Sequence, residues 1–237
     1  AGGPVCTPSR SVLMTGLHNG HTPARDNIPH YHTYLLENDV TIAEILRSKG
    51  YATGCFGKWH LGDQPSFLPN NHGFDTYFGV PYSNDMDWKE RGDPPLPLVH
   101  NTTVIKAPVD QRYLTQWCTD RAIEFIKDNY NTPFFAYIPF NMPHNPIFAS
   151  SGFEGKSFNG IYGDAIEEID YSVGRIISLL DSLNISDNTL LVFTSDNGPW
   201  LVYNQHGGSA GLLQNGKGTT WDGGMREPTI FWHANIK

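Results

Sequence analysis

The sequence predicts an α/β fold, and three observations lead to this prediction. Segments with helical spacing of apolar residues alternate with short apolar runs that are typical of strands. Hydrophobic residues make up 39% of the 237 residues, which is enough for one large core. An apolar run ends abruptly in Asp196 and Asn197, as strands of parallel sheets do next to a ligand site. We find no internal repeat and no linker that would divide the chain into domains.

Two helices are predicted in the first fifty residues. Pro8 suits the first turn of a helix, because the N–H that proline lacks has no partner there, and Gly16 can end this helix. Residues 41–50 form the second helix, which begins with a capping box of Thr41 and Glu44. Three of its residues are expected to face the core: Ile42, Ile45 and Leu46.

The middle of the chain contains strands, a helix and long loops. Residues 51–60 are predicted to form a strand that runs into a loop, and residues 133–140 a short buried strand. Residues 65–108 are rich in Pro, Asn, Asp and Gly, which predicts long loops. Residues 110–130 are predicted to be helical, with one apolar face made of Leu114, Trp117, Cys118, Phe125 and Ile126.

The last third begins with the longest predicted helix, residues 162–183. Its apolar stripe has helical spacing, so the helix should pack on the sheet and carry no chemistry. The stripe consists of Ile166, Ile169, Val173, Ile176, Ile177 and Leu180. Residues 189–199 then read as a continuous apolar strand, of the kind that is buried on both faces in a parallel sheet.

Composition excludes several classes of protein. A net charge of −8 argues against a general nucleic-acid binder, and no apolar run approaches the roughly 18 residues of a membrane span. Three cysteines are too few for a disulfide scaffold, and Cys55 and Cys118 are expected to be buried thiols or one disulfide. Asn101 and Asn184 begin N-x-[ST] sequons, which indicate the secretory pathway only weakly.

Cys6 begins the segment CTPSR, just where the first helix is predicted to start. A helix N-terminus attracts anions and lowers the pKa of a thiol, so a nucleophile is one interpretation and a buried structural thiol is the other. A cysteine phosphatase needs an arginine six positions after its cysteine. Arg10 follows after four, so the spacing excludes that class.

The pattern C-x-P-S-R, followed by a helix of small residues and T-G, resembles the signature of the type I sulfatase family. Four further segments appear in the order that this family has. The chain is similar in particular to the arylsulfatase A and N-acetylgalactosamine-6-sulfatase group, and the resemblance extends over essentially the whole chain. The four segments are GKWHLG at 57–62, MPHNP at 142–146, SDNGP at 195–199 and GKGTTWDGGMREP at 216–228.

This resemblance implies an alkaline-phosphatase-like fold, with a mixed sheet and helices on both faces. It also implies that residues 1–237 are a partial sulfatase catalytic domain, truncated at both ends. The first strand, which carries two acidic metal ligands in the family, and the C-terminal subdomain are expected to be missing. We therefore expect this chain to bind metal poorly and to be inactive alone, while its full-length parent is a sulfatase.

The resemblance further implies hydrolysis of sulfate esters through a modified side chain. Cys6 would be oxidised to Cα-formylglycine by the formylglycine-generating enzyme during synthesis. The aldehyde hydrate offers two hydroxyl groups on one carbon, one to attack sulfur and one to release sulfate. Asp196, Asn197 and an oxygen of the modified Cys6 would bind a divalent cation, and oxygen ligands indicate Ca²⁺ or Mg²⁺. We favour Ca²⁺ by resemblance.

Four residues are expected to contact the sulfate group by the same resemblance. Lys58 and Lys217 would hold the anion as point charges. His144 or Lys217 would protonate the leaving oxygen. Ser83 is a weaker candidate for a sulfate contact, and its simpler interpretation is an ordinary loop residue.

Two further residues of the motifs are expected to assist. Arg10 would anchor the hydrate and the carboxylates on the metal side, and His60 would help to deprotonate the second hydroxyl group. His30 and His32 look like a metal-binding pair, but no other ligands accompany them, so we interpret them as surface residues.

Two alternatives to a sulfatase are open. One is a phosphoester or phosphonate hydrolase that uses the same aldehyde, and the other is a catalytically inactive fragment that has kept the fold. For a sulfatase, the substrate could be a sulfated small molecule, glycolipid or glycan, with specificity in the loops at residues 83–108 and 199–215. The resemblance and the sequons imply a lysosomal or secreted protein. A homo-oligomer is possible in either location.

Overall fold

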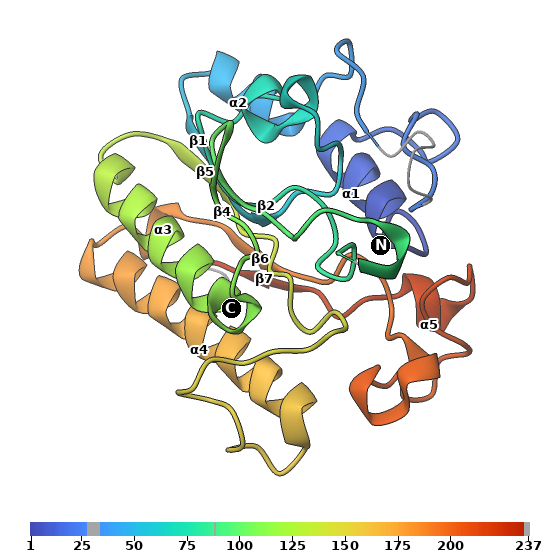
Figure 1. The fold of residues 1–237 in the computed structure, drawn as a ribbon. Coiled ribbons are helices and arrows are strands. Elements are labelled where there is room, and N and C mark those ends of the chain that lie inside the picture. The colour runs from blue at the N-terminus through green and yellow to red at the C-terminus, as the bar shows by residue number, and fades with distance from the viewer. Residues whose placement is uncertain (28–33, 88, 235–237) are drawn as a thin grey trace.

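The computed structural model describes residues 1–27, 34–87 and 89–234, and its main sheet has five strands (Figure 1). β1 (Ala52–Lys58) lies between β2 (Thr76–Val80) and β5 (Phe134–Tyr137) and is parallel to both. β3 (Leu98–His100) and β4 (Thr103–Lys106) extend the sheet beyond β2 with antiparallel pairing. The sheet is therefore mixed, as predicted.

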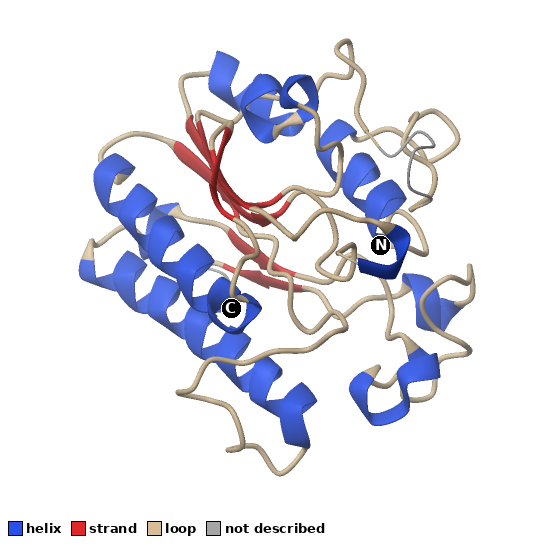
Figure 2. Ribbon diagram, viewed as in Figure 1, coloured by secondary structure: helices blue, strands red, loops and turns tan. Residues whose placement is uncertain are grey.

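Helices cover both faces of this sheet (Figure 2). α3 (Leu114–Asn129) packs on one face, and α4 (Gly160–Ser182) packs against α3. α2 (Ile42–Ser48) lies on the other face, next to α1 (Cys6–Thr15). Successive strand residues point to opposite faces. Each face therefore has its own core: Phe56 and Phe78 belong to the core under α3, and Cys55 and Tyr77 to the core under α2.

A second sheet has two strands, β6 (Leu191–Phe193) and β7 (Ile230–Trp232), which are antiparallel. The short helix α5 (Asp222–Met225) precedes β7. The prediction of a strand buried on both faces in a parallel sheet is wrong here, because Val192 is 48% exposed and Phe193 is 36% exposed. Within the described ranges β6 pairs with β7 alone, and only Leu191 of its three residues packs against the core under α3.

The prediction of long loops between residues 65 and 108 is also wrong, because this region contains β2, β3 and β4. It contains in addition the 3-10 turns η1 (Pro65–Phe67), η2 (Pro69–Asn71) and η3 (Lys89–Arg91). These strands have three to five residues each, too few to show a period in the sequence. Asn101, with φ of 55°, turns the chain between β3 and β4.

Two predicted helix limits near the N-terminus, the end of α1 and the start of α2, are confirmed. Gly16 ends α1 with φ of 68°, and its N–H donates to Val12 O at 2.8 Å. Thr41 and Glu44 form the predicted capping box at the start of α2. The predicted core face of α2 is wrong, however, because Ile42 is 39% exposed and Ile45 is 52% exposed. The small Ala43 is the residue of α2 that packs into the core, while Leu46 is half-buried.

The two long helices confirm most of their predicted faces. In α3 the buried positions include Leu114, Cys118, Phe125 and Ile126, and Trp117 is half-buried. In α4 the residues Ile169, Ile176 and Leu180 are buried, but Ile166 is 40% exposed. The buried carboxylates of Asp164 and Glu168 occupy that end of the helix instead, where both accept backbone N–H groups of residues 150–157.

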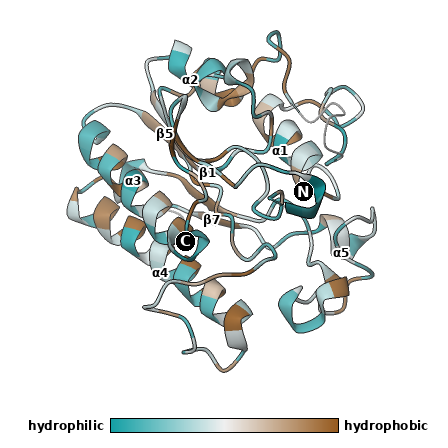
Figure 3. Cartoon of the chain, in the orientation of Figure 1, coloured by the Kyte–Doolittle hydropathy of each residue, from teal (hydrophilic) through white to brown (hydrophobic). Residues whose placement is uncertain are grey.

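The remaining predictions concern cysteines and surface features. Cys55 and Cys118 are free, buried thiols, so the alternative of one disulfide is wrong. β5 is half-buried rather than fully buried, and Figure 3 shows hydrophobic residues concentrated on the strands of the main sheet. Among the described helices, none is both long and apolar enough to cross a bilayer. His30 and His32 lie outside the described residues.

Candidate active site

Cys6 is the first residue of α1, because Val5 before it has extended backbone angles. Its side chain is only 1% exposed, and the first turn of the helix is buried with it. The N-terminal end of a helix carries a partial positive charge and free N–H groups, which favour an anion next to Cys6.

Lys58 is the last residue of β1, and its side chain is 1% exposed. Its Nζ donates to Cys6 Sγ at 3.4 Å and to Ser83 Oγ at 3.1 Å. The backbone before it passes close to the loop after β5: a Cβ atom on Gly57 would lie 2.0 Å from Pro139 O. Glycine therefore allows the close approach that places Lys58 against Cys6. Ser83 belongs to the site because its hydroxyl group accepts a hydrogen bond from the Lys58 ammonium group.

Arg10 connects α1 to two other segments. Its Nε donates to Asp196 Oδ2 at 2.8 Å, and its Nη1 donates to Lys58 O through a short hydrogen bond. The Arg10 side chain is 6% exposed and that of Asp196 is 24% exposed. Burial disfavours the guanidinium charge, but Asp196, with smaller contributions from Tyr137 and Cys6, outweighs burial and raises the pKa of Arg10, so the ion pair is maintained at physiological pH.

His144 and Lys217 form a second cluster beside Cys6. His144 Nδ1 lies 2.6 Å from the carbonyl oxygen of Asn145, which can only accept, so Nδ1 carries the proton. The unprotonated Nε2 therefore accepts from Lys217 Nζ at 2.9 Å. This pair presents one ammonium group and one imidazole to the same space.

His60 is buried behind Lys58, with an unusual φ of 60°. Its carbonyl oxygen accepts from Thr7 Oγ1 at 3.2 Å, and its ring Nδ1 is buried without a hydrogen-bond partner. Burial, followed by the charges of Lys58 and Arg10, lowers the pKa of His60 well below its usual value. His60 is therefore neutral at physiological pH.

The electrostatics of Cys6 connect all these groups. Burial alone would raise the pKa of its thiol, but the charge of Lys58, the proximity of His144, and the charges of Lys217 and Arg10 together lower it well below the usual value. An anionic group at this position is thus stabilised by at least three cations. The structure brings together every residue that the sequence motifs predicted for substrate contact.

Asp196 and Asn197 follow β6 at the edge of the same site. Asn197 is 9% exposed, its Nδ2 donates to Gly198 O at 3.0 Å, and its Oδ1 is buried without a partner. An unpartnered amide oxygen beside a carboxylate is a donor set that fits a hard cation such as Ca²⁺ or Mg²⁺. Within the ranges that the structure describes, no group of three or more His, Cys, Asp or Glu side chains could hold a metal, so the donor set is partial.

Two residues near the site were missed by the sequence analysis. Asp85 interacts with Ser83, His144 and Lys58, which together outweigh its burial and lower its pKa. Trp200 lies against the His144–Lys217 pair: its ring centroid is 5.4 Å from that of His144. The sequence marks these two residues only by their nearness to predicted site residues. Asp85 lies two residues after Ser83, and Trp200 lies three residues after Asn197.

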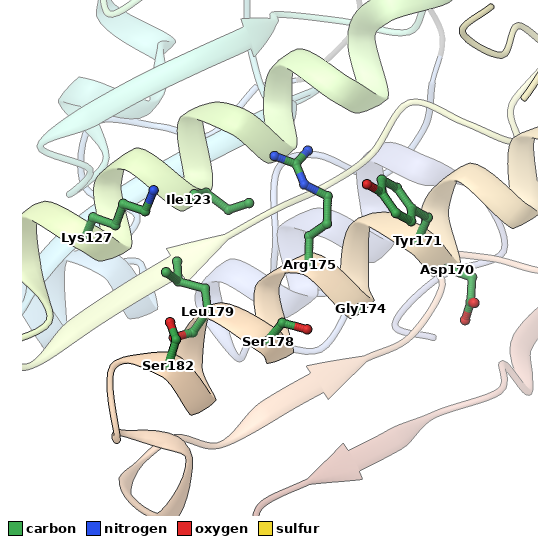
Figure 4. Close-up of a pocket in the computed structure, with 9 residues that line it drawn as sticks. All are labelled: Ile123, Lys127, Asp170, Tyr171, Gly174, Arg175, Ser178, Leu179 and Ser182. Atoms are coloured by element: carbon green, nitrogen blue, oxygen red, sulfur yellow. The ribbon is translucent and has the colours of Figure 1, made fainter. Parts of the chain in front are cut away.

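A separate groove of about 670 Å³ lies between α3 and α4 (Figure 4). It contains none of the predicted residues and is wide open to solvent. Side chains such as Lys127, Tyr171 and Arg175 line it, and Arg175 is paired with Asp120 at 2.8 Å.

Comparisons with known proteins agree with the resemblance. A family model described as Sulfatase matches residues 1–237. The chain is 38% identical to mouse N-acetylgalactosamine-6-sulfatase over 97% of its length and 35% identical to human arylsulfatase A over 98%, covering 48% and 50% of those proteins. The crystal structure of PsFucS1 sulfatase from Pseudoalteromonas sp. superposes with a TM-score of 0.82 at 28% identity, covering 99% of this chain and 53% of that one. The chain thus spans about half the length of the curated relatives it matches.

Proposed function

Since this chain belongs to the sulfatase family, as the match over residues 1–237 shows, we propose that it forms part of the catalytic domain of a sulfuric ester hydrolase. The observation that carries this proposal is the convergence of Lys58, the His144–Lys217 pair and Arg10 on Cys6. Cations placed around a buried reactive position suit an ester that is itself an anion. Further metal ligands would come from parts of the protein outside these residues.

Cys6 Sγ occupies the place where the modified side chain would present its oxygen. In the oxidised, hydrated form, Cys6 would supply two hydroxyl groups on one carbon, one to attack sulfur and the other to release sulfate. Asp196 and Asn197 would hold a divalent cation, for which Ca²⁺ is the first candidate and Mg²⁺ the second. This cation would supply positive charge to the sulfate oxygens and to the hydroxyl group that attacks sulfur.

The positions of the other site residues suggest which of them would bind sulfate, transfer protons or position the metal ligand. Lys58 would bind a sulfate oxygen, because its ammonium group already contacts both Cys6 and Ser83. Lys217 donates to His144, so one proton can pass from this pair to the leaving oxygen. The buried Nδ1 of His60 has no hydrogen-bond partner, which leaves it available to take the proton from the second hydroxyl group. Arg10 would hold Asp196 in place for the metal.

The names of the relatives suggest the substrate class and the place of action. N-acetylgalactosamine-6-sulfatase acts, by its name, on a sulfated sugar, and we extend sulfated glycans or glycolipids to this protein as candidate substrates. Modification of Cys6 requires the formylglycine-generating enzyme as a partner during synthesis. The sequon at the exposed residue Asn184 is compatible with a lysosomal or secreted protein.

The first experiment is mass spectrometry of the peptide that contains Cys6, from full-length protein made in a host with the converting enzyme. We expect the aldehyde in place of the thiol. The same sample is then assayed side by side on an aryl sulfate and the corresponding aryl phosphate, and we expect faster hydrolysis of the sulfate. An unconverted thiol would favour an inactive relative, and faster phosphate hydrolysis would assign the protein to phosphoester chemistry.

A further inference from the structure

The segment that follows Asn197 places two aromatic rings beside the proposed proton donors. Lys217 Nζ lies 4.2 Å from the centroid of the Trp200 ring, and the His144 ring lies 5.4 Å from it. The ring of Tyr203 meets Trp200 edge-on, with the centroids 4.7 Å apart. Trp200 therefore touches both groups that would face the leaving oxygen of a sulfate ester.

Trp200 also marks the boundary between the buried site and solvent. Asn197 and Gly198 are buried, Trp200 is half-buried, and residues 201–206 are exposed. The ring of Tyr203 belongs to this exposed part and is 42% exposed. The alcohol part of a sulfate ester extends away from the leaving oxygen toward solvent. Trp200 and Tyr203 lead from the His144–Lys217 pair to the exposed surface, so they are placed to meet this alcohol part.

Hydrogen bonds hold this segment, η6 (Leu201–His206) and its flanks, in one shape. Trp200 N donates to Gly207 O at 2.8 Å, and Asn145 Nδ2 donates to His206 O at 2.9 Å. The first bond closes the loop on itself, and the second ties it to the residue next to His144. A Cβ atom on Gly207 would lie 2.0 Å from Trp200 O, so only glycine permits this closure. A surface that is ordered before binding loses little entropy when a ligand arrives.

We propose that Trp200 and Tyr203 form the binding surface for the pyranose ring of a sulfated sugar, the alcohol part of the substrate. A pyranose presents an apolar C–H face, which packs on an aromatic ring, and a rim of hydroxyl groups. The exposed amides of Asn204 and Gln205 follow Tyr203 directly and can bind such hydroxyl groups. A lipid chain would instead need a continuous apolar wall. Leu201 and Val202 are exposed before Tyr203, but the exposed amides after it end this apolar run. The inference rests on the proposed function and specifies its substrate.

The test compares two substrates of full-length, converted protein that differ only beyond the ester oxygen. One is a monosaccharide sulfate, and the other is ethyl sulfate, which has no ring. In the Tyr203→Ala variant we expect kcat/KM for the sugar sulfate to fall about 2- to 13-fold, the size of a lost aromatic contact, and that for ethyl sulfate to stay unchanged. Val202→Ala, in the same loop with Val202 75% exposed, is the matched control and should alter neither value.

Each other result decides against the proposal or against its premise. An equal loss on both substrates would make Tyr203 a support of the fold or of the catalytic groups, and no loss on the sugar sulfate would also overturn the proposal. If Tyr203→Ala does not unfold cooperatively, Tyr203→Leu, which keeps most of the volume without the ring, is judged by the same ratio.

A binding measurement separates this proposal from the proposed function. The unsulfated monosaccharide should bind to the wild-type protein in a calorimetric titration, and this binding should be lost in Trp200→Leu but retained in part in Trp200→Phe. If neither sulfate ester is hydrolysed and the sugar still binds in this way, the proposed function fails and the sugar site stands. If the esters are hydrolysed without any dependence on Trp200 or Tyr203, the reverse holds.

Discussion

Arg10 shows how single side chains assemble this site. One guanidinium group bonds to Asp196, 186 positions away, and to the backbone of Lys58, 48 positions away. Both bonds use the fixed fork of an arginine, in which Nε and Nη1 point in different directions. The residue thereby holds α1, the end of β1 and the segment after β6 together, and Cys6 lies one helical turn before it.

The fork geometry of Arg10 leads to a stability prediction. In Arg10→Lys, a single ammonium group cannot reach both Asp196 and Lys58 O, so one buried acceptor is left unpaired. We expect the free energy of unfolding to fall by about 1–3 kcal/mol in urea denaturation at pH 7. Arg226→Lys is the control, because the Arg226–Asp222 pair is exposed on both sides. Equal effects of the two substitutions would show that the Arg10 fork has no special role.

Lys58 leads to a prediction about activity. Lys58→Met removes the charge and keeps most of the volume of a side chain that is 1% exposed. If the ammonium group stabilises the sulfate in the transition state, kcat of the full-length enzyme should fall about 10²- to 10³-fold. Steady-state kinetics on an aryl sulfate measure this, with the exposed Lys127→Met as control. A fall of less than about threefold would remove Lys58 from the proposed mechanism.

Individual elements were predictable where a local signal begins or ends them. The capping box at Thr41 and the left-handed Gly16 place the limits of α2 and α1 in the sequence itself. The strands β2, β3 and β4 escaped prediction because they are short and their stability comes from pairing, which a local pattern does not record. The prediction that Ile42 and Ile45 face the core was wrong for a related reason. Which face of α2 is buried depends on the elements that pack against it, and these are distant in the sequence.

Asp164 in α4 leads to a pH prediction. Its carboxylate accepts the backbone N–H groups of Gly155, Lys156 and Ser157 at 2.7–3.0 Å. Burial would raise its pKa, but these three bonds outweigh burial and lower it. A lowered folded-state pKa gives stability that is present above the unfolded value of about 3.9 and is lost as the pH falls through the folded value.

The expected result is a pH-dependent effect of Asp164→Asn. At pH 7 the substitution should lower the free energy of unfolding by about 1–3 kcal/mol, because a neutral amide accepts these bonds less well. The difference from wild type should shrink as the pH falls below about 4 in urea unfolding series. Asp187→Asn serves as control, since Asp187 is exposed in η5 (Ser186–Asn188). A difference that is constant with pH would contradict the account.

At the scale of the whole molecule, the described residues form two sheets, and one cluster of site residues joins them. Lys58 leaves the five-stranded sheet, and Asp196 follows the two-stranded one. The site therefore depends on how the two sheets are held against each other, and the Arg10 bonds are part of that contact. The chain covers about half of its curated relatives, so the relatives have as much sequence again with which to complete such a site.

The arrangement of the whole molecule leads to a prediction about metal binding. Asp196 and Asn197 offer few of the 6–8 oxygens that Ca²⁺ prefers, so this chain alone should bind Ca²⁺ weakly. Calorimetric titration of the 237-residue chain should show no stoichiometric binding at micromolar Ca²⁺, while the full-length protein should bind one ion. The full-length Asn197→Ala variant should bind it more weakly. Tight one-to-one binding by the chain alone, abolished by Asn197→Ala, would contradict this expectation.

The sequence by itself determined the chemical inventory: a cysteine at a helix start, the lysines and histidines of the motifs, and an acid and an amide after an apolar strand. These follow from local order along the chain, which motifs and helix caps record. Only the tertiary structure decided that Lys217 pairs with His144 across 73 positions, that Lys58 donates to Ser83, and that Trp200 lies against both Lys217 and the His144 imidazole. Such contacts arise from packing between distant segments, and no local pattern encodes the distance at which two of them meet.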